Sequence, residues 1–183
     1  MNRERMHELA DFLEELPQEK FDMNHWFVTK DPTILDRFKD SHIEDFDDVV
    51  FRKFDLDLPD ITRLGKEAKG DYSMVCTTAA CIAGWTCFLW PEEVDESQTV
   101  EKNAIRILNL GNWDAHNIFM SFNLDTQGAA IALRRFANEP EGENSLGSIL
   151  FQESLNSNNR TLLKAMEQNN VKDNEENLRG ADD

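Results

Sequence analysis

The segment from Met74 to Trp90, MVCTTAACIAGWTCFLW, is the most apolar part of the chain and decides its fold. It contains all three cysteines, a run of small residues and two of the four tryptophans. It falls short of the ~20 apolar residues that span a bilayer, and it includes three threonines. We therefore expect a buried central helix that begins near Thr77 or Thr78 and ends before Pro91.

Small residues recur four apart in this segment, at Ala79 and Ala83 and again at Ala80 and Gly84. On a helix, residues four apart form a narrow ridge that lets another helix approach closely. A glycine inside a helix costs about 1 kcal/mol relative to alanine. Close packing therefore explains Gly84 better than helix propensity does.

The flanking sequence predicts further helices. Residues 3–16 carry apolar side chains at spacings of three and four, and Pro17 ends this pattern. Helices are also predicted at 100–110 with Gly111 as C-cap, at 113–119, and from Asp125 or Thr126 to about residue 137. Strict alternation over residues 54–58 indicates a strand.

These elements predict a mainly α fold, a compact helical domain around the buried central helix. The alternative is α+β, if a short two-stranded element forms near residues 49–58. We expect a helical core domain at 1–140 with an acidic insertion at about 28–70, which ends in a surface loop at 65–70. A C-terminal helical extension at 141–168 and a disordered acidic tail at 169–183 complete the predicted organisation.

The composition suits one domain, since 40% of the 183 residues are hydrophobic. The charge is lopsided, with 19 Lys and Arg against 36 Asp and Glu, a formal net charge of −17 that is spread along the chain. Nucleic acids and anionic membranes both attract clustered cations, so neither is an expected direct partner. A protein with a basic surface is the expected partner, although acidity can also serve solubility alone.

The N-terminal residues lack an apolar stretch of signal-peptide length. Three cysteines, an odd number, fit reduced thiols. We therefore expect a cytoplasmic protein without membrane association; the sequence does not indicate its oligomeric state.

Motifs for chemistry are weak. No nucleotide-binding, zinc-protease or serine-hydrolase motif is present, and the cysteine spacing does not suit a shared zinc ion. We therefore expect no metal and no cofactor. One catalytic alternative is a Cys81 nucleophile in the first turn of the central helix, with His116 or His25 as base and Asp114 or Asp22 orienting that base.

A family resemblance rests on two stretches. Phe21-Asp22-Met23 with Trp26 is followed by Cys76-Thr77 and by Ala80-Cys81-Ile82-Ala83-Gly84-Trp85. This order resembles a family of small proteins from bacteriophages and bacterial mobile elements, in which leucine-rich and alanine-rich helices follow. Most members have no assigned activity, so the resemblance implies a setting rather than a reaction.

The sequence as a whole favours a non-enzymatic, phage-type accessory protein that binds a host or phage protein through an acidic surface. In a stronger version the protein mimics nucleic acid and inhibits a DNA- or RNA-binding enzyme. The alternatives are a cysteine-dependent enzyme centred on Cys81 and a virion structural or assembly component. The expected contact residues are Glu44, Asp45, Asp47, Asp48, Asp55 and Asp57.

Overall fold

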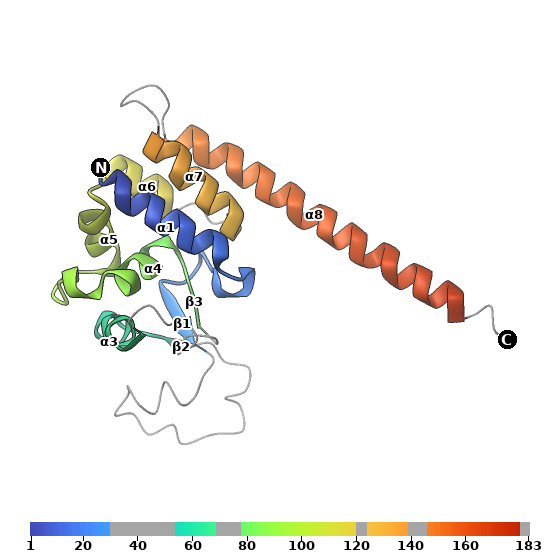
Figure 1. The fold of residues 1–183 in the computed structure, drawn as a ribbon, viewed down its shortest axis with the longest axis horizontal. Helices are drawn as coiled ribbons and strands as arrows, with labels where there is room; N and C mark the ends of the chain where they lie inside the picture. Colours follow the sequence, from blue (N-terminus) through green and yellow to red (C-terminus); the bar gives the residue numbers. More distant parts are fainter. Residues whose placement is uncertain (30–53, 69–77, 120–123, 139–145, 180–183) are drawn as a thin grey trace, which may run out of the picture.

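A computed structural model describes residues 1–29, 54–68, 78–119, 124–138 and 146–179. The fold is mainly helical with a small sheet, as the sequence predicts, and one long C-terminal helix extends away from the body (Figure 1). The elements in chain order are α1 (Arg3–Glu15), η1 (Gln18–Lys20), β1 (Phe27–Thr29), β2 (Phe54–Asp55), α3 (Leu58–Ala68), β3 (Thr78–Ala80), α4 (Ile82–Leu89), η4 (Pro91–Glu93), α5 (Val100–Leu108), α6 (Asn112–Phe119), α7 (Thr126–Asn138) and α8 (Leu146–Arg179).

Helix α4 is the central element, and each of its residues from Ile82 to Phe88 is buried. It lies between α3 and α5. The Trp85 ring lies 5.1 Å from the Phe27 ring and 5.4 Å from the Phe88 ring, both in edge-on contacts. Its indole N–H donates to the Lys20 carbonyl at 3.1 Å, so the polar atom of this buried side chain is satisfied. The predicted buried central helix is confirmed.

The start of the central helix was predicted too early. Residues Thr78–Ala80 form β3, which pairs with β1, and α4 begins only at Ile82. Cys81 is the extended residue that precedes the helix. The sequence pattern could not separate strand from helix here, because a continuous apolar run fits either when both are buried.

Gly84 is explained by close packing, as predicted, although its close neighbour is not a helix. A Cβ atom at this position would lie 1.6 Å from the Trp26 carbonyl oxygen, immediately before β1. Only a residue without a side chain lets α4 approach this backbone. The ridge predicted from Ala79 and Ala80 does not lie on the helix, because both residues belong to β3.

The sheet has the order β2-β1-β3, with β1 antiparallel to both neighbours. Val28 pairs with Asp55 on one side and with Ala79 on the other. Strand β2 falls within the predicted element at 49–58. It pairs with β1, and residues 49–53 of the predicted element lie outside the described chain.

The end of the predicted insertion belongs to the core. Residues 58–68 form α3, in place of the strand end and the surface loop that the sequence predicts. Ile61, Leu64 and Ala68 are buried, at helical spacing. Asp57 caps the helix, accepting from the Asp60 N–H at 3.1 Å. Gly65 packs on α4, where an added Cβ would lie 2.3 Å from the Phe88 carbonyl oxygen.

The other predicted helices of the body are confirmed at α1, α5, α6 and α7. Their caps are partly as expected. Asp125 caps α7 by accepting from the Gly128 N–H at 2.7 Å. Helix α5 ends on Asn109, whose φ of 50° is left-handed, instead of using Gly111. Asparagine tolerates this conformation better than most residues with a side chain.

Helix α8 is continuous from Leu146 to Arg179, whereas a helical extension and a disordered tail from residue 169 were predicted. Between Ser148 and Arg179 the sequence contains neither glycine nor proline, so nothing locally interrupts a helix. The first part of α8 packs against α6 and α7, and the rest projects beyond the body (Figure 1).

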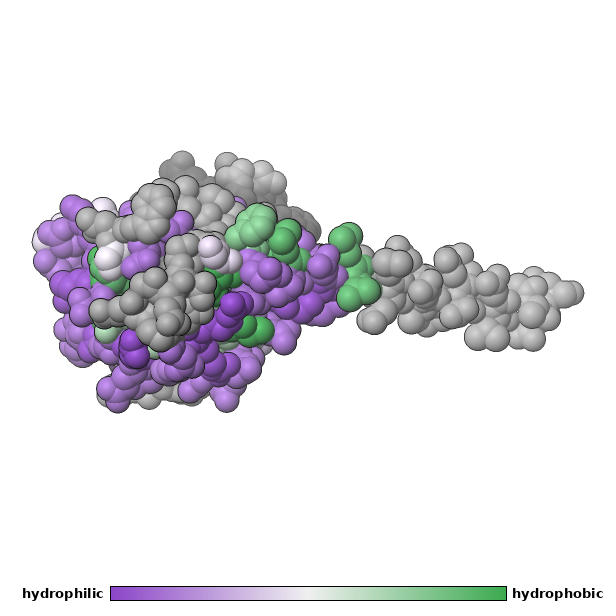
Figure 2. Space-filling model, turned by 90° about the horizontal axis from the view of Figure 1, so that it is seen from above, coloured by the Kyte–Doolittle hydropathy of each residue, from purple (hydrophilic) through white to green (hydrophobic). Residues whose placement is uncertain are grey.

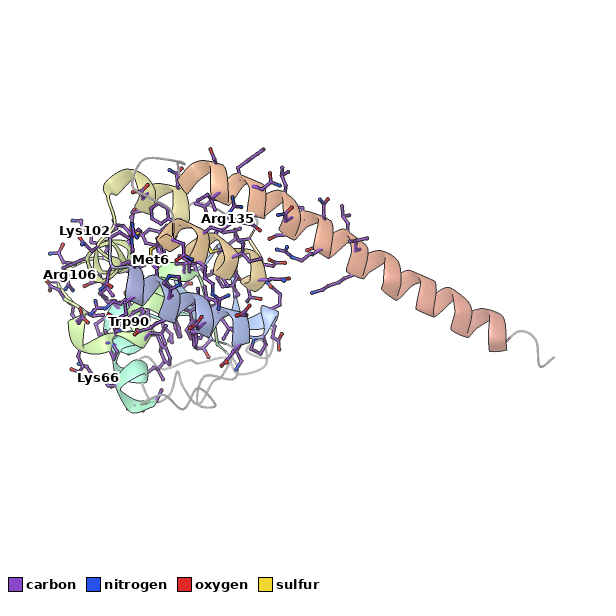
Figure 3. The ribbon with its side chains drawn as sticks, turned by 45° about the horizontal axis from the view of Figure 1, so that its top comes forward. Met6, Lys66, Trp90, Lys102, Arg106 and Arg135 are labelled. Atoms are coloured by element: carbon purple, nitrogen blue, oxygen red, sulfur yellow. The ribbon has the colours of Figure 1, made fainter. Side chains whose placement is uncertain are left out.

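Two polar clusters hold α8 to α7. Asp125 accepts from both Nε of Arg160, at 2.8 Å, and the Ser157 hydroxyl, also at 2.8 Å. Glu153, only 4% exposed, accepts from Arg135 of α7 at 3.0 Å; Arg135 is labelled in Figure 3. The buried Glu153 and the half-buried Asp125 are therefore both paired.

Candidate functional site

The predicted nucleophile Cys81 lies at the N-terminus of α4, as the catalytic alternative requires. It is the N-cap residue, and its backbone N–H donates to the His25 carbonyl at 3.0 Å. Its sulfur lies 4.0 Å from the Trp26 carbonyl oxygen. The residue is only 2% exposed, so a reagent or substrate has little access to the thiol.

Burial also controls the protonation of this thiol. It raises the pKa of Cys81 to about 11, and the negative charge of Asp22 acts in the same direction. The backbone N–H groups of Ala83 and Gly84 favour the thiolate, as expected at a helix start, but the effect of burial is larger. Cys81 is therefore a protonated thiol at neutral pH, unlike an activated cysteine nucleophile.

The candidate base His25 is near Cys81 in the fold and contacts Asp22, the residue expected to orient it. Its Nδ1 atom lies 2.9 Å from a carboxylate oxygen of Asp22. Asp22 also accepts from the Asn24 N–H at 3.0 Å, which fixes the turn before β1. Among the described residues, the acceptor for the Cys81 thiol is the Trp26 carbonyl and not the imidazole. The other candidate base, His116, belongs to α6, and its side chain lies outside the described part of the chain.

The two cysteines in the described part of the chain, Cys81 and Cys87, direct their sulfurs to different partners. Cys87 directs its sulfur to the Val100 carbonyl at 3.6 Å, whereas the Cys81 sulfur faces Trp26. Within the described ranges, no group of three or more His, Cys, Asp or Glu side chains is placed to hold a metal ion. The described residues therefore offer no metal centre.

The structure describes two of the six predicted acidic contact residues. Glu44, Asp45, Asp47 and Asp48 lie outside the described residues. Asp55 and Asp57 are both exposed, on β2 and before α3 respectively.

Asp57 has a structural role besides its exposure, because it caps α3. Burial and the adjacent Asp57 carboxylate raise the pKa of Asp60, although Arg63 pairs with Asp60 at 3.1 Å. The N-terminus of α3 therefore brings two carboxylates together, one of them buried.

The structure places a longer row of carboxylates on α1. Glu4, Glu8, Asp11 and Glu15 are all exposed and follow one another at spacings of four, three and four residues. This spacing puts them on one face of the helix, opposite buried Leu9 and Leu13. The row spans about 16 Å at 1.5 Å per residue. We call these four residues the α1 carboxylate row.

Part of this row is paired. Arg134 of α7 lies 2.5 Å from Asp11 and 2.7 Å from Glu14, an exposed neighbour of the row. These contacts hold the pKa of Glu14 below its usual range. Among the described residues, no cation pairs with Glu4, Glu8 or Glu15. Three of the four carboxylates of the row, Glu4, Glu8 and Glu15, are therefore exposed and not neutralised by a described cation.

The spacing that reveals this row could be read from the sequence. The periodicity of residues 3–16 indicates the buried face of α1, and it also places these carboxylates together on the opposite face. Like charges three and four residues apart lie on one face of a helix, just as apolar residues with that spacing do.

No helix in the described parts of the chain combines the length and apolar character needed to cross a membrane. No family model, curated protein or solved structure matches this chain. The resemblance to small phage and mobile-element proteins therefore stays a prediction, and function has to be argued from the geometry.

Proposed function

We propose that this protein is a non-enzymatic accessory protein, of the phage type that the sequence resembles, which binds the basic surface of a host or phage protein. The observation that carries the proposal is the α1 carboxylate row on a chain of net charge −17. Complementary potentials steer such partners together and set their orientation.

The geometry of the row supports the stronger version, in which the protein mimics nucleic acid. Its four carboxylates follow at about 4.5 to 6 Å along the helix axis, and one of them, Asp11, is paired with Arg134. Phosphates on one DNA strand follow at about 3.4 Å of axial rise, a spacing of the same order. A basic cleft built for a phosphate backbone would find a comparable line of charge on α1. Asp55 and Asp57 add exposed negative charge near the sheet.

The chemistry at Cys81 does not support the enzymatic alternative. The thiol is buried and protonated, and it faces the Trp26 carbonyl and not the His25 imidazole. The contact of His25 with Asp22 is the one expected of an oriented base, but a reaction at Cys81 would require the thiol to become accessible and to turn to that base.

The experiment is affinity capture from bacterial lysate at low ionic strength, with identification of bound proteins by mass spectrometry. We expect the wild type to capture a nucleic-acid-binding protein that duplex DNA and added salt both displace, because they compete for or screen the same charges. The variant with Glu4, Glu8 and Glu15 all changed to Gln should lose this protein.

A matched control carries the same change in net charge at Glu167, Glu175 and Glu176, which belong to the distal part of α8. This control should bind as the wild type does. The proposal fails if the wild type captures no protein that salt releases. It also fails if the triple variant on α1 and the triple control variant on α8 bind alike.

A further inference from the structure

Helix α8 carries most of the exposed large hydrophobic side chains. Five such side chains are exposed in the described chain, and four of them belong to α8: Phe151 (67%), Leu155 (44%), Leu162 (62%) and Leu163 (59%). Figure 2 shows hydrophobic surface along the described part of this helix, on a molecule whose visible surface is mostly hydrophilic. Exposed apolar groups gathered on one element mark an interaction surface.

Three of these residues share one face of α8. Phe151, Leu155 and Leu162 follow at spacings of four and seven, and exposed Asn158 fills the gap to give steps of four, three and four. This is the repeat of a coiled-coil seam. We call these four residues the α8 seam. Leu163 lies off the seam, about 100° further around the helix.

The seam faces away from the body. Ile149, Leu150, Glu153 and Ser157 are buried on the opposite side of α8. Glu153 and Arg160, the only charged residues between 148 and 163, turn toward the body and bind Arg135 and Asp125. Every residue classed as exposed in this range is uncharged.

This lack of charge contrasts with the rest of the chain. Residues 1–145 carry 29 acidic and 15 basic residues, a net charge of −14, whereas α8 carries five and four. A basic partner would find little to attract it on the uncharged face. A second copy of this chain, which the acidic bodies would otherwise repel, can approach there with least repulsion.

We propose that the α8 seam is the surface on which two copies of this protein associate, with their α8 helices antiparallel. In this arrangement Phe151 of one copy packs against Leu162 of the other, and Leu155 packs beside Asn158. The two bodies then lie on opposite sides of the helix pair, which keeps the acidic surfaces apart.

The contact is small. With three apolar side chains per copy, it buries on the order of 1,000 Å² or less, the size of a weak or transient interface. We therefore expect a monomer–dimer equilibrium with a dissociation constant of about ten micromolar or weaker. Added salt should strengthen it by screening the repulsion between bodies, the opposite of its effect on binding to a basic partner.

Sedimentation equilibrium of the full chain, up to ~500 µM and at low and moderate NaCl, tests this proposal. We expect a reversible dimer that Leu162→Glu abolishes and that the matched off-seam variant Leu163→Glu retains. Far-UV circular dichroism should show equal helix content in both variants. A wild type that is monomeric throughout, or equal effects of the two substitutions, would overturn the proposal.

A charge exchange tests the antiparallel arrangement. Phe151→Lys and Leu162→Glu should each yield a monomer, because each introduces a charge into an apolar contact. The double variant should recover the dimer, because the introduced lysine of each copy then faces the introduced glutamate of the other. A double variant that stays monomeric, while the wild type dimerises, would overturn the antiparallel pairing.

Discussion

Helices α4 and α8 are formed by opposite causes. Helix α4 has eight residues, including a glycine, a threonine and two large aromatics, and on its own it would be too short and too poor in helix formers to be stable. Helix α8 has 34 residues with no breaker after its first turn and, among its described side chains, the Arg160–Asp125 pair is the anchoring contact furthest along the helix. Tertiary burial imposes the first helix, whereas local preference maintains much of the second.

The two helices therefore differ in how strictly packing constrains their residues. In α4 the buried side chains pack closely against their neighbours, so adding or removing one methyl group should change the stability of the fold. In the outer part of α8, substitution should be tolerated unless it breaks the helix. Four experiments test this contrast.

The largest expected effect is at Gly84. The Gly84→Ala variant has no room for its Cβ, which would lie 1.6 Å from the Trp26 carbonyl oxygen. We expect the variant to lose about 3 kcal/mol or more of unfolding free energy, at the upper end of overpacking effects. Gly111→Ala is the matched control: its Cβ would meet nothing closer than 3.4 Å, and urea denaturation should show a change of less than ~1 kcal/mol. Equal losses would contradict the packing argument.

The second expected effect is on thiol chemistry. Burial raises the pKa of Cys81 to about 11 and that of Cys87 to about 12. At pH 8 Cys81 should alkylate roughly a hundred times more slowly than an exposed cysteine, because the thiolate is the reactive form. Mass spectrometry of peptides after iodoacetamide treatment would measure both rates, with protein unfolded in urea as the control. Fast labelling of Cys81 in the folded protein would show that the reagent reaches the N-terminus of α4.

The third effect concerns Asp125, which anchors α8 by accepting hydrogen bonds from Arg160 and Ser157. Burial raises the pKa of Asp125, but the hydrogen bonds from Arg160, the Gly128 N–H and Ser157 together outweigh burial, so this pKa is lowered. Asp125→Ala, which loses the α7 cap as well, should cost about 2 kcal/mol at pH 7, and Asp125→Asn about half as much.

The pH dependence of this anchor follows from the lowered pKa. The ionised carboxylate is favoured in the folded state, so its stabilisation is complete above the unfolded pKa of about 3.9 and is lost as the pH falls through the lower folded value. The difference between wild type and Asp125→Ala in urea denaturation should therefore shrink below about pH 4. A difference independent of pH would contradict the charged anchor.

The smallest effect is expected from removing the projecting end of α8. Deletion of residues 165–183 begins beyond the Arg160 anchor, and it should change the unfolding free energy of the body by less than ~0.5 kcal/mol. The mean helix content measured by circular dichroism should fall. A substantial loss of body stability would show that the distal helix is part of the core.

The sequence predicted the helical class and the central position of α4 because burial leaves a strong pattern: an apolar run flanked by amphipathic helices. It misplaced the start of that helix because Thr78–Ala80 become a strand only by pairing with β1, far earlier in the chain. The same long-range pairing gives β2 a partner outside the predicted two-stranded element. Such pairings are not encoded in local periodicity.

For the candidate site, the sequence correctly placed Cys81 beside a helix start but could not weigh burial against the helix N–H groups. The structure shows that burial has the larger effect on its pKa. The α1 carboxylate row was readable from spacing alone. The seam on α8 was not, since its exposure depends on which face of that helix meets the body.

The central claim is that function lies on the carboxylate surface and not at Cys81. The most direct test is the dissociation constant for the captured partner, measured over a range of NaCl concentrations for three forms of the protein. These are the wild type, the Glu4, Glu8 and Glu15→Gln variant, and Cys81→Ala. We predict that the triple variant binds at least about tenfold more weakly with a flatter salt dependence, and that Cys81→Ala binds like the wild type. Full binding by the triple variant with loss in Cys81→Ala would contradict the claim.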